Sequence, residues 1–145
     1  NKRTRYSEAE ERERGITYAE KDEVIRRADV LSLHTPLTPE TRHLIGAREL
    51  AMMKPTAILI NTARGAVVDE PALVAALKDG RIAAAGLDVF EQNDVPSPEL
   101  FELENVSLTP HIGTQTYDSR VEMVHEMCNN VIGFLRGDRK IDRVN

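Results

Sequence analysis

The sequence lacks most features that mark secreted, membrane-spanning and disulfide-stabilised proteins. Its one cysteine, Cys128, allows no intrachain disulfide and fits a reducing compartment. No apolar run approaches the roughly 20 residues that span a bilayer, and no charged-then-apolar signal segment opens the chain. We therefore expect a cytoplasmic protein, with Cys128 as a packed thiol in an apolar helix.

Patterns typical of nucleic-acid, anionic-membrane and metal binding are also missing. The formal net charge of the 145 residues is -5, and the basic residues are scattered among acidic ones. Neither an H-x-x-x-H motif nor clustered Cys and His spacing occurs. The sequence therefore predicts no nucleic-acid partner, no membrane partner and no metal site.

The chain opens abruptly. Asn1 is not an initiator methionine, residues 1–5 (NKRTR) have no cap or strand before them, and no G-x-G-x-x-G motif follows. We expect that a preceding segment is missing.

The composition that is present, 41% hydrophobic and 30% charged, is typical of a globular domain with a real core. Four short apolar runs rich in β-branched residues occupy residues 28–33, 57–60, 83–89 and 106–108. These runs predict buried parallel strands.

Helical signals separate these runs. Residues 69–79 begin with Asp69 as N-cap, carry Pro71 in the first turn and are followed by Gly80, which together predict a helix. Shorter, more exposed helices are expected at residues 46–53 and 7–14.

The longest predicted helix covers residues 116–137. Its apolar residues recur at helical spacing and predict a core or interface face rather than a cofactor site. They are Val121, Val124, Cys128, Val131 and Leu135.

Strands that alternate with helices at these lengths predict an α/β fold with right-handed crossovers and a doubly wound parallel sheet. In such sheets ligands bind beyond the carboxyl ends of the strands. Polar residues follow these ends at positions 34–36, 61–65, 88 and 109–113. We expect them to converge on one edge and form a ligand site.

Four strings carry a resemblance to a known family: HTPLTPETRHLIG (residues 34–46), INTARGAVVDEPAL (60–73), AGLDVFE (85–91) and NVSLTPHIG (105–113). Their order and spacing resemble the C-terminal half of the D-2-hydroxyacid dehydrogenases, a family that includes glyoxylate and hydroxypyruvate reductases and phosphoglycerate dehydrogenase relatives. These enzymes move a hydride between NAD(P)H and a small 2-oxo or 2-hydroxy acid.

The resemblance implies a Rossmann-like dinucleotide-binding domain whose first strand and glycine-rich loop lie upstream of this chain. Residues 1–115 correspond to the C-terminal part of the NAD(P)-binding domain. Residues 116–145 correspond to a helix and tail that return toward the substrate domain.

Two catalytic residues follow from the resemblance. Arg64 matches the arginine that binds the substrate carboxylate, a task that suits a planar, permanently charged guanidinium. His111 matches the residue that donates a proton in the reaction. An imidazole suits this role because it changes protonation near neutral pH. By default, His34, His43 and His125 are interpreted as structural.

Cofactor contacts also follow from the resemblance. Asp88 matches an aspartate near the nicotinamide, and an aspartate within an apolar strand needs a polar partner in any case. The other positions expected to contact the cofactor are Pro36, Thr62, Ala63, Arg64, His111 and Gly113.

One position departs from the family pattern. Relatives carry a glutamate that hydrogen-bonds the catalytic histidine, and here that position is Asn93. Asparagine can orient an imidazole but adds no negative charge. Whether Glu91 or Asp94 replaces the glutamate is left open by the sequence.

The first residues bear on the choice of cofactor. NAD-using relatives place an acidic residue at the end of the second strand, and this register falls on Asn1 or Lys2, followed by Arg3, Thr4 and Arg5. The absence of a carboxylate favours NADP over NAD, although an exposed basic loop is the alternative interpretation.

The favoured function is a 2-oxoacid reductase, which by the resemblance is expected to be a homodimer. Two other functions remain as alternatives. The family includes dinucleotide-sensing corepressors that act by binding partners, and the lost glutamate fits such a protein. A formate dehydrogenase is less favoured because the loop after Asn93 lacks the proline-rich pattern of those enzymes.

Overall fold

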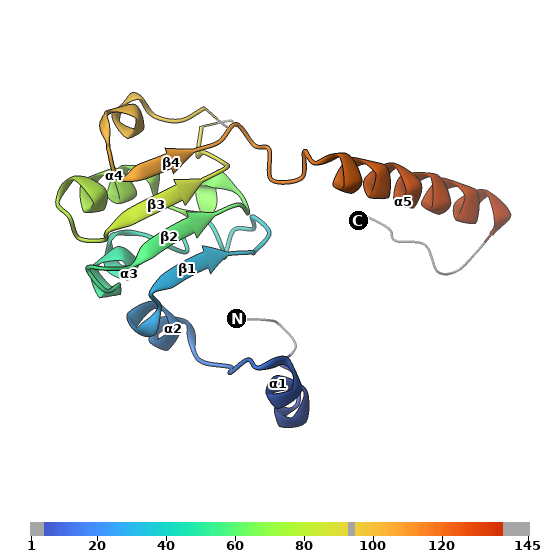
Figure 1. Ribbon diagram of the computed structural model, residues 1–145, viewed down its shortest axis with the longest axis horizontal. Coiled ribbons are helices and arrows are strands. Elements are labelled where there is room, and N and C mark those ends of the chain that lie inside the picture. Colours follow the sequence, from blue (N-terminus) through green and yellow to red (C-terminus); the bar gives the residue numbers. More distant parts are fainter. Residues whose placement is uncertain (1–4, 93–94, 138–145) are drawn as a thin grey trace. The chain divides into compact units, whose positions relative to one another are not determined.

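The computed structural model describes residues 5–92 and 95–137, and the chain forms two compact units, residues 1–110 and residues 111–145. The first unit contains a parallel sheet whose four strands lie side by side in sequence order (Figure 1). The strands are β1 (Val30–Leu33), β2 (Ile58–Asn61), β3 (Ala84–Leu87) and β4 (Val106–Leu108). Each coincides with one of the predicted apolar runs to within two residues, so the predicted α/β fold with a parallel sheet is confirmed.

The strand order β1-β2-β3-β4 does not reverse within the described sheet. A doubly wound sheet consists of two halves that run outward from a switch point, and sequential order is the order within one half. All four carboxyl ends lie at one edge because every pairing is parallel.

Only one face of the sheet is fully buried in the described residues. Leu31, Leu59 and Ala85 point into the core, where helices contribute Ile25, Leu50 and Leu73 among others. Residues of the opposite face are half-buried or exposed, with Val30 58% exposed. The predicted buried strands β1, β2 and β3 are thus buried on one face only in the described residues, because an apolar run does not specify whether both faces of a strand are covered.

Helices α3 (Ala47–Met52) and α4 (Glu70–Lys78) link the strands and confirm two predicted helices. The α4 boundaries follow from its caps: Asp69 accepts a hydrogen bond from the Ala72 N–H at 3.1 Å, and Gly80 adopts the left-handed φ of 64°. Short 3₁₀ turns η1 (Gly65–Val67) and η2 (Pro98–Glu102) complete the connections.

Two helices precede the sheet. The predicted helix α1 (Glu8–Arg14) begins at a capping box in which Ser7 and Glu10 each accept from the other's backbone N–H. Helix α2 (Lys21–Arg27) was not predicted, because seven residues with one buried apolar side chain, Ile25, carry little periodic signal.

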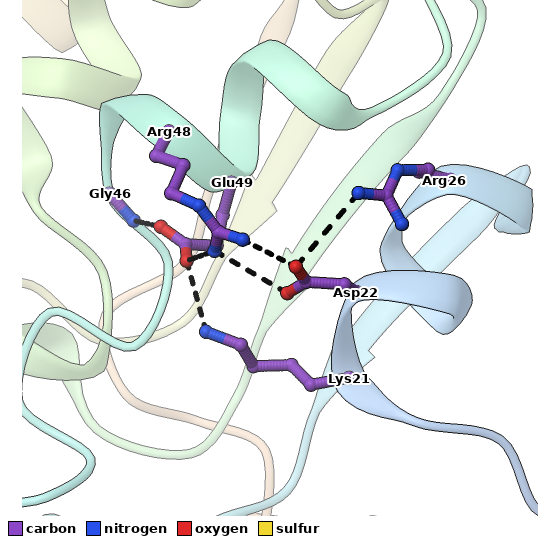
Figure 2. Close-up of polar contacts among 6 residues, drawn as sticks. All are labelled: Lys21, Asp22, Arg26, Gly46, Arg48 and Glu49. Atoms are coloured by element: carbon purple, nitrogen blue, oxygen red, sulfur yellow. Dashed lines mark hydrogen bonds and ion pairs between the residues drawn. The ribbon is translucent and has the colours of Figure 1, made fainter.

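An ion-pair network joins α2 to α3 (Figure 2). The Glu49 carboxylate, 8% exposed as a residue, accepts from Lys21 Nζ at 2.9 Å, Arg48 Nη1 at 2.8 Å and the Gly46 N–H at 3.3 Å. Asp22 pairs with Arg48 in the same network. Burial acts to raise the pKa of Glu49, but the hydrogen bonds from Lys21, Gly46 and Arg48 outweigh it and lower the pKa to about 2.

This network makes an acid-dependent contribution to stability. The pKa of Glu49 is lower in the folded protein than its ordinary value, so the charged carboxylate stabilises the fold fully at pH values above the ordinary pKa. This contribution is lost as the pH falls toward about 2. We expect Glu49→Gln to lower the free energy of unfolding by about 1–2 kcal/mol near neutral pH, with the difference from the unchanged protein shrinking as the pH falls below about 4.5 and lost near about pH 2. Denaturant unfolding at several pH values measures this.

Glu23→Gln is the matched control, since it removes an exposed carboxylate that pairs with Arg27 along α2. Exposed pairs of this kind contribute little. Equal losses from both substitutions would contradict the prediction.

The second unit contains helix α5 (Tyr117–Arg136), which confirms the predicted long helix; its N-cap is Thr116 and it ends at Gly137 with a φ of 75°. Its predicted apolar stripe is exposed, with Val124 52% and Leu135 78% exposed, and Cys128 is exposed too. The expectation of a packed thiol is therefore wrong for the unit by itself. The stripe was predicted to be a core or interface face; the unit provides no core for it, and the interface stays a prediction, because helical spacing specifies a face but not what covers it. None of the helices in the described ranges combines the length and apolar character needed to cross a bilayer.

Candidate functional site

The carboxyl ends of β1 and β2 border a hollow of about 460 Å³. Four residues expected to contact a cofactor line this hollow, and one of them is Arg64, the candidate substrate-binding arginine. These residues come from two of the four family strings, residues 34–46 and 60–73, which the fold brings together. Its lining residues are His34, Thr35, Pro36, Leu37, Thr62, Ala63 and Arg64. A volume of several hundred Å³ is typical of ligand pockets.

The chain leaves β2 through a turn at residues 63–67, here named the ARG turn. Asn61, 1% exposed, organises it: the Asn61 side chain accepts from the Ala63 N–H at 3.1 Å and donates to the Arg64 carbonyl at 3.0 Å. Arg64 itself is exposed and donates from Nη1 to the Ala63 carbonyl at 2.7 Å. The backbone of Arg64 is therefore fixed at the border of the hollow, while its side chain is exposed.

Sequence reasoning placed Asn61 at the strand end but assigned it no role. The residue type could have indicated this role, because an asparagine at the end of a strand commonly forms hydrogen bonds with the backbone of the following turn.

Gly65 lies against the end of the β3 segment. A Cβ at this position would lie 1.8 Å from the Phe90 carbonyl oxygen, a distance no side chain can occupy. Glycine is required here because two backbones approach closely. The ARG turn is thereby packed onto the chain that follows β3.

Asp88 follows β3 and is 6% exposed. Its carboxylate accepts from the Thr109 hydroxyl at 2.6 Å, and its N–H donates to the Asn61 carbonyl at 3.0 Å. The prediction that this buried aspartate needs a polar partner is confirmed. Thr109, which follows β4, is a partner that the sequence did not single out.

Glu91 is the centre of a second polar cluster in this unit. One carboxylate oxygen accepts from His43 Nε2 at 2.6 Å and Arg42 Nη2 at 2.9 Å, and the other accepts from the Glu70 N–H at 3.3 Å. Burial acts to raise the pKa of Glu91, but the hydrogen bonds from His43 and Glu70 and the charges of His43 and Arg42 lower it below its usual range. Both oxygens are thus engaged within the first unit.

The remaining predicted residues fall elsewhere. His111 opens the second unit with an exposed side chain and a left-handed φ of 54°, and Gly113 follows in the same unit. Asn93 and Asp94 lie outside the described residues, as do Asn1, Lys2, Arg3 and Thr4. The neighbouring Arg5 donates to Glu11 at 3.0 Å and stacks on the Tyr18 ring, 4.6 Å from its centroid.

Thr35 offers an observation that bears on ligand binding. Its hydroxyl oxygen is buried beside the hollow and has no hydrogen-bond partner in the described part of the chain. Buried hydroxyls are normally paired, so a polar group of a ligand fits there. Among residues 5–92 and 95–137, no three His, Cys, Asp or Glu side chains group as metal ligands would.

Comparison with known proteins gives close relatives over almost the whole chain. Glyoxylate reductase of Thermococcus litoralis is 52% identical over 143 residues, which are 99% of this chain and 43% of that protein. Glyoxylate/hydroxypyruvate reductase B of Enterobacter agglomerans is 48% identical, over 100% of this chain and 45% of that protein. The chain therefore spans less than half the length of these relatives.

Solved structures agree with the fold. A D-isomer specific 2-hydroxyacid dehydrogenase from Lactobacillus delbrueckii in its NAD-complexed form has a TM-score of 0.84 at 37% identity, over 97% of this chain and 46% of that one. A glyoxylate reductase from Paecilomyes thermophila has a TM-score of 0.83 at 42% identity, over 90% of this chain and 39% of that one. Residues 1–113 match the family described as D-isomer specific 2-hydroxyacid dehydrogenase, NAD binding domain, and because this match covers most of the chain and agrees with the parallel sheet, the chain belongs to that family.

Proposed function

We propose that the protein containing this chain is an NAD(P)-dependent oxidoreductase that reduces a small 2-oxo acid, of the glyoxylate or hydroxypyruvate type, to the D-2-hydroxy acid. The observation that carries the proposal is the ARG turn, which presents Arg64 to the hollow beside Pro36, Thr62 and Ala63. Relatives named glyoxylate reductase support the choice of substrate class.

Arg64 binds the carboxylate of the substrate. A guanidinium presents its N–H donors in a fixed fork that matches the two carboxylate oxygens, so the reacting carbon is oriented as well as held. Asn61 and Gly65 keep the backbone of the turn in place while the side chain binds. Orientation of this kind accounts for a large share of enzymatic rate enhancement.

His111 holds the proton that completes the reaction. In reduction, protonated His111 donates to the carbonyl oxygen as the carbonyl carbon gains a hydride, and neutral His111 accepts the hydroxyl proton in the reverse direction. The nicotinamide cofactor, when bound, supplies or accepts the hydride. A 2-oxo acid, one hydride and one proton thus give one 2-hydroxy acid.

The residues around the hollow fit a dinucleotide. The buried hydroxyl of Thr35, unpaired within the described residues, suits a polar group of the cofactor, and Pro36, Thr62 and Ala63 would border the cofactor. Asp88 faces the same strand ends, held by Thr109. The family resemblance adds His111 and Gly113 to the proposed cofactor contacts.

NADP is the favoured cofactor in this proposal. No carboxylate occurs among residues 1–5, and cationic and hydroxyl-bearing residues suit a 2′-phosphate. Arg5 supports this only in part, since it already pairs with Glu11.

A substrate panel with the intact protein tests the function and the cofactor together. We expect glyoxylate or hydroxypyruvate to be reduced with a higher kcat/KM for NADPH than for NADH. A preference for NADH would contradict the cofactor assignment, and dinucleotide binding without turnover of any 2-oxo acid would favour a dinucleotide-sensing binding protein, which Asn93 in place of the family glutamate also fits.

The assembly is proposed to be a homodimer in which residues 116–145 return toward a substrate domain. The exposed apolar side chains of α5, including Val124 and Leu135, suit a face that another part of the protein or a second copy covers. Sedimentation of the intact protein as a monomer at micromolar concentration would refute the dimer.

Asn93 provides a test of the proton donor. At the position of the family glutamate, Asn93 carries no negative charge, so the Asn93→Glu variant is expected to stabilise the protonated proton donor and extend reduction to higher pH, with about 1.4 kcal/mol for each pH unit gained. The pH profile of 2-oxoacid reduction in both proteins measures the shift. Profiles that superimpose would contradict either the role of His111 or the need for a carboxylate at position 93.

A further inference from the structure

The ARG turn lies between two other segments of the first unit. On one side, the His43 N–H donates to the Ala66 carbonyl at 2.8 Å and the Ile45 N–H donates to the Val67 carbonyl at 3.1 Å. On the other side, Gly65 packs directly on the Phe90 backbone. The turn that carries Arg64 is therefore held from both sides.

Glu91 ties these two flanking segments together. It follows Phe90 in the chain, and its carboxylate reaches across to His43 at 2.6 Å and Arg42 at 2.9 Å. The Glu91 side chain is 16% exposed, whereas that of Arg42 is 56% exposed, so the carboxylate is the sheltered member of the cluster. Charge-assisted bonds to a sheltered carboxylate are stronger than surface ion pairs.

Glu70 reinforces the same connection from the start of α4. The Glu70 N–H donates to Glu91, and the Glu70 carboxylate accepts from the Glu91 N–H at 3.1 Å and from the Ser97 N–H at 2.9 Å. Each glutamate thus accepts from the backbone of the other. This reciprocal pair fixes the backbone of Glu91 as well as its side chain.

His43 adopts a left-handed backbone with a φ of 51°. This conformation is uncommon for residues other than glycine, and it persists where surrounding contacts impose it, often near functional sites. His43 therefore connects the ARG turn to Glu91: its N–H donates to the Ala66 carbonyl and its ring contacts the Glu91 carboxylate.

We propose that Glu91 and His43 are positioning residues whose hydrogen bond clamps the ARG turn, so that Arg64 binds the substrate carboxylate in one orientation. The inference rests on the proposed function of Arg64. Neither residue lines the hollow beside Arg64, and both act through the backbone of the turn.

Steady-state kinetics of the intact protein test the role through Arg64. Glu91→Gln is expected to raise the KM for the 2-oxo acid about tenfold and to leave the KM for NADPH within about twofold. In a protein that already carries Arg64→Gln, the same substitution should add nothing, because residues that act through one another are not additive. Independent, additive effects would overturn the proposal.

Amide hydrogen exchange tests the clamp without any assay of activity. The Val67 and Val68 N–H groups donate within the turn to the carbonyls of Arg64 and Gly65. Their exchange should accelerate about tenfold in Glu91→Gln while amides of β2 keep their rates. Unchanged exchange at Val67 and Val68 would overturn the clamp.

Two further variants make the outcome unambiguous. His43→Asn removes the ring contact but keeps a residue type that tolerates a left-handed backbone, so it carries the same test if Glu91→Gln does not fold. Glu23→Gln removes an exposed carboxylate paired with Arg27 and should change neither readout. If the unchanged protein reduces no 2-oxo acid, the proposed function fails, and the exchange rates then decide the clamp alone.

Discussion

Replacing His111 by asparagine is expected to lower kcat for 2-oxoacid reduction about 10²- to 10⁴-fold, the usual contribution of a positioned general acid. Asparagine suits the test because it accepts the left-handed φ of 54° at this position, so the backbone need not change. The KM for NADPH should stay within about twofold, since the loss concerns proton transfer. Stopped-flow or steady-state measurement of NADPH oxidation gives both values.

His125→Asn is the matched control, because His125 is an exposed histidine on α5 with no assigned role. We expect it to retain full activity. A loss in His111→Asn no greater than in the control would remove His111 as the proton donor.

The second large effect is expected at Arg64. Arg64→Gln should lower kcat/KM for the 2-oxo acid about 10²- to 10³-fold, mainly through KM, because a neutral amide cannot replace a bidentate ion pair with the carboxylate. Arg64→Lys keeps the charge but loses the fork, so its loss should be smaller yet still about tenfold or more. Initial rates over a range of substrate concentrations separate KM from kcat.

Arg81→Gln serves as the control for the loss of an exposed arginine, since Arg81 lies beyond α4 and outside the hollow. It should leave the kinetics unchanged. An Arg64→Lys enzyme with unaltered KM would contradict bidentate binding by Arg64.

Local sequence was sufficient for all four strands and for helices α1, α3 and α4 of the first unit. Asp69, Pro71 and Gly80 marked α4 because caps act through bonds to neighbouring backbone groups, and the structure has those bonds. The apolar runs marked the strands because short runs rich in β-branched residues are typical of buried parallel strands. Helix α2 was not predicted, because the apolar periodicity of seven residues is too weak to distinguish a helix from a loop.

The predicted site depended on strand order. Parallel strands bring their carboxyl ends to one edge, which is why Pro36 and Arg64, 28 positions apart in the sequence, line the same hollow. The sequence pattern could not indicate that Asn61 orders the ARG turn, because an asparagine has many possible partners and only the folded turn selects among them.

The sequence by itself determined the family, the parallel α/β fold and the residue types available for carboxylate binding and proton transfer, since motifs and caps are properties of short stretches of chain. Only the tertiary structure decided that Gly65 meets Phe90, that Thr109 pairs with Asp88 and that Glu91 joins His43. These contacts connect residues more than 20 positions apart, where the approach of two backbones and the shelter of a carboxylate depend on packing. Packing also decided which apolar faces are covered, which periodicity alone does not specify.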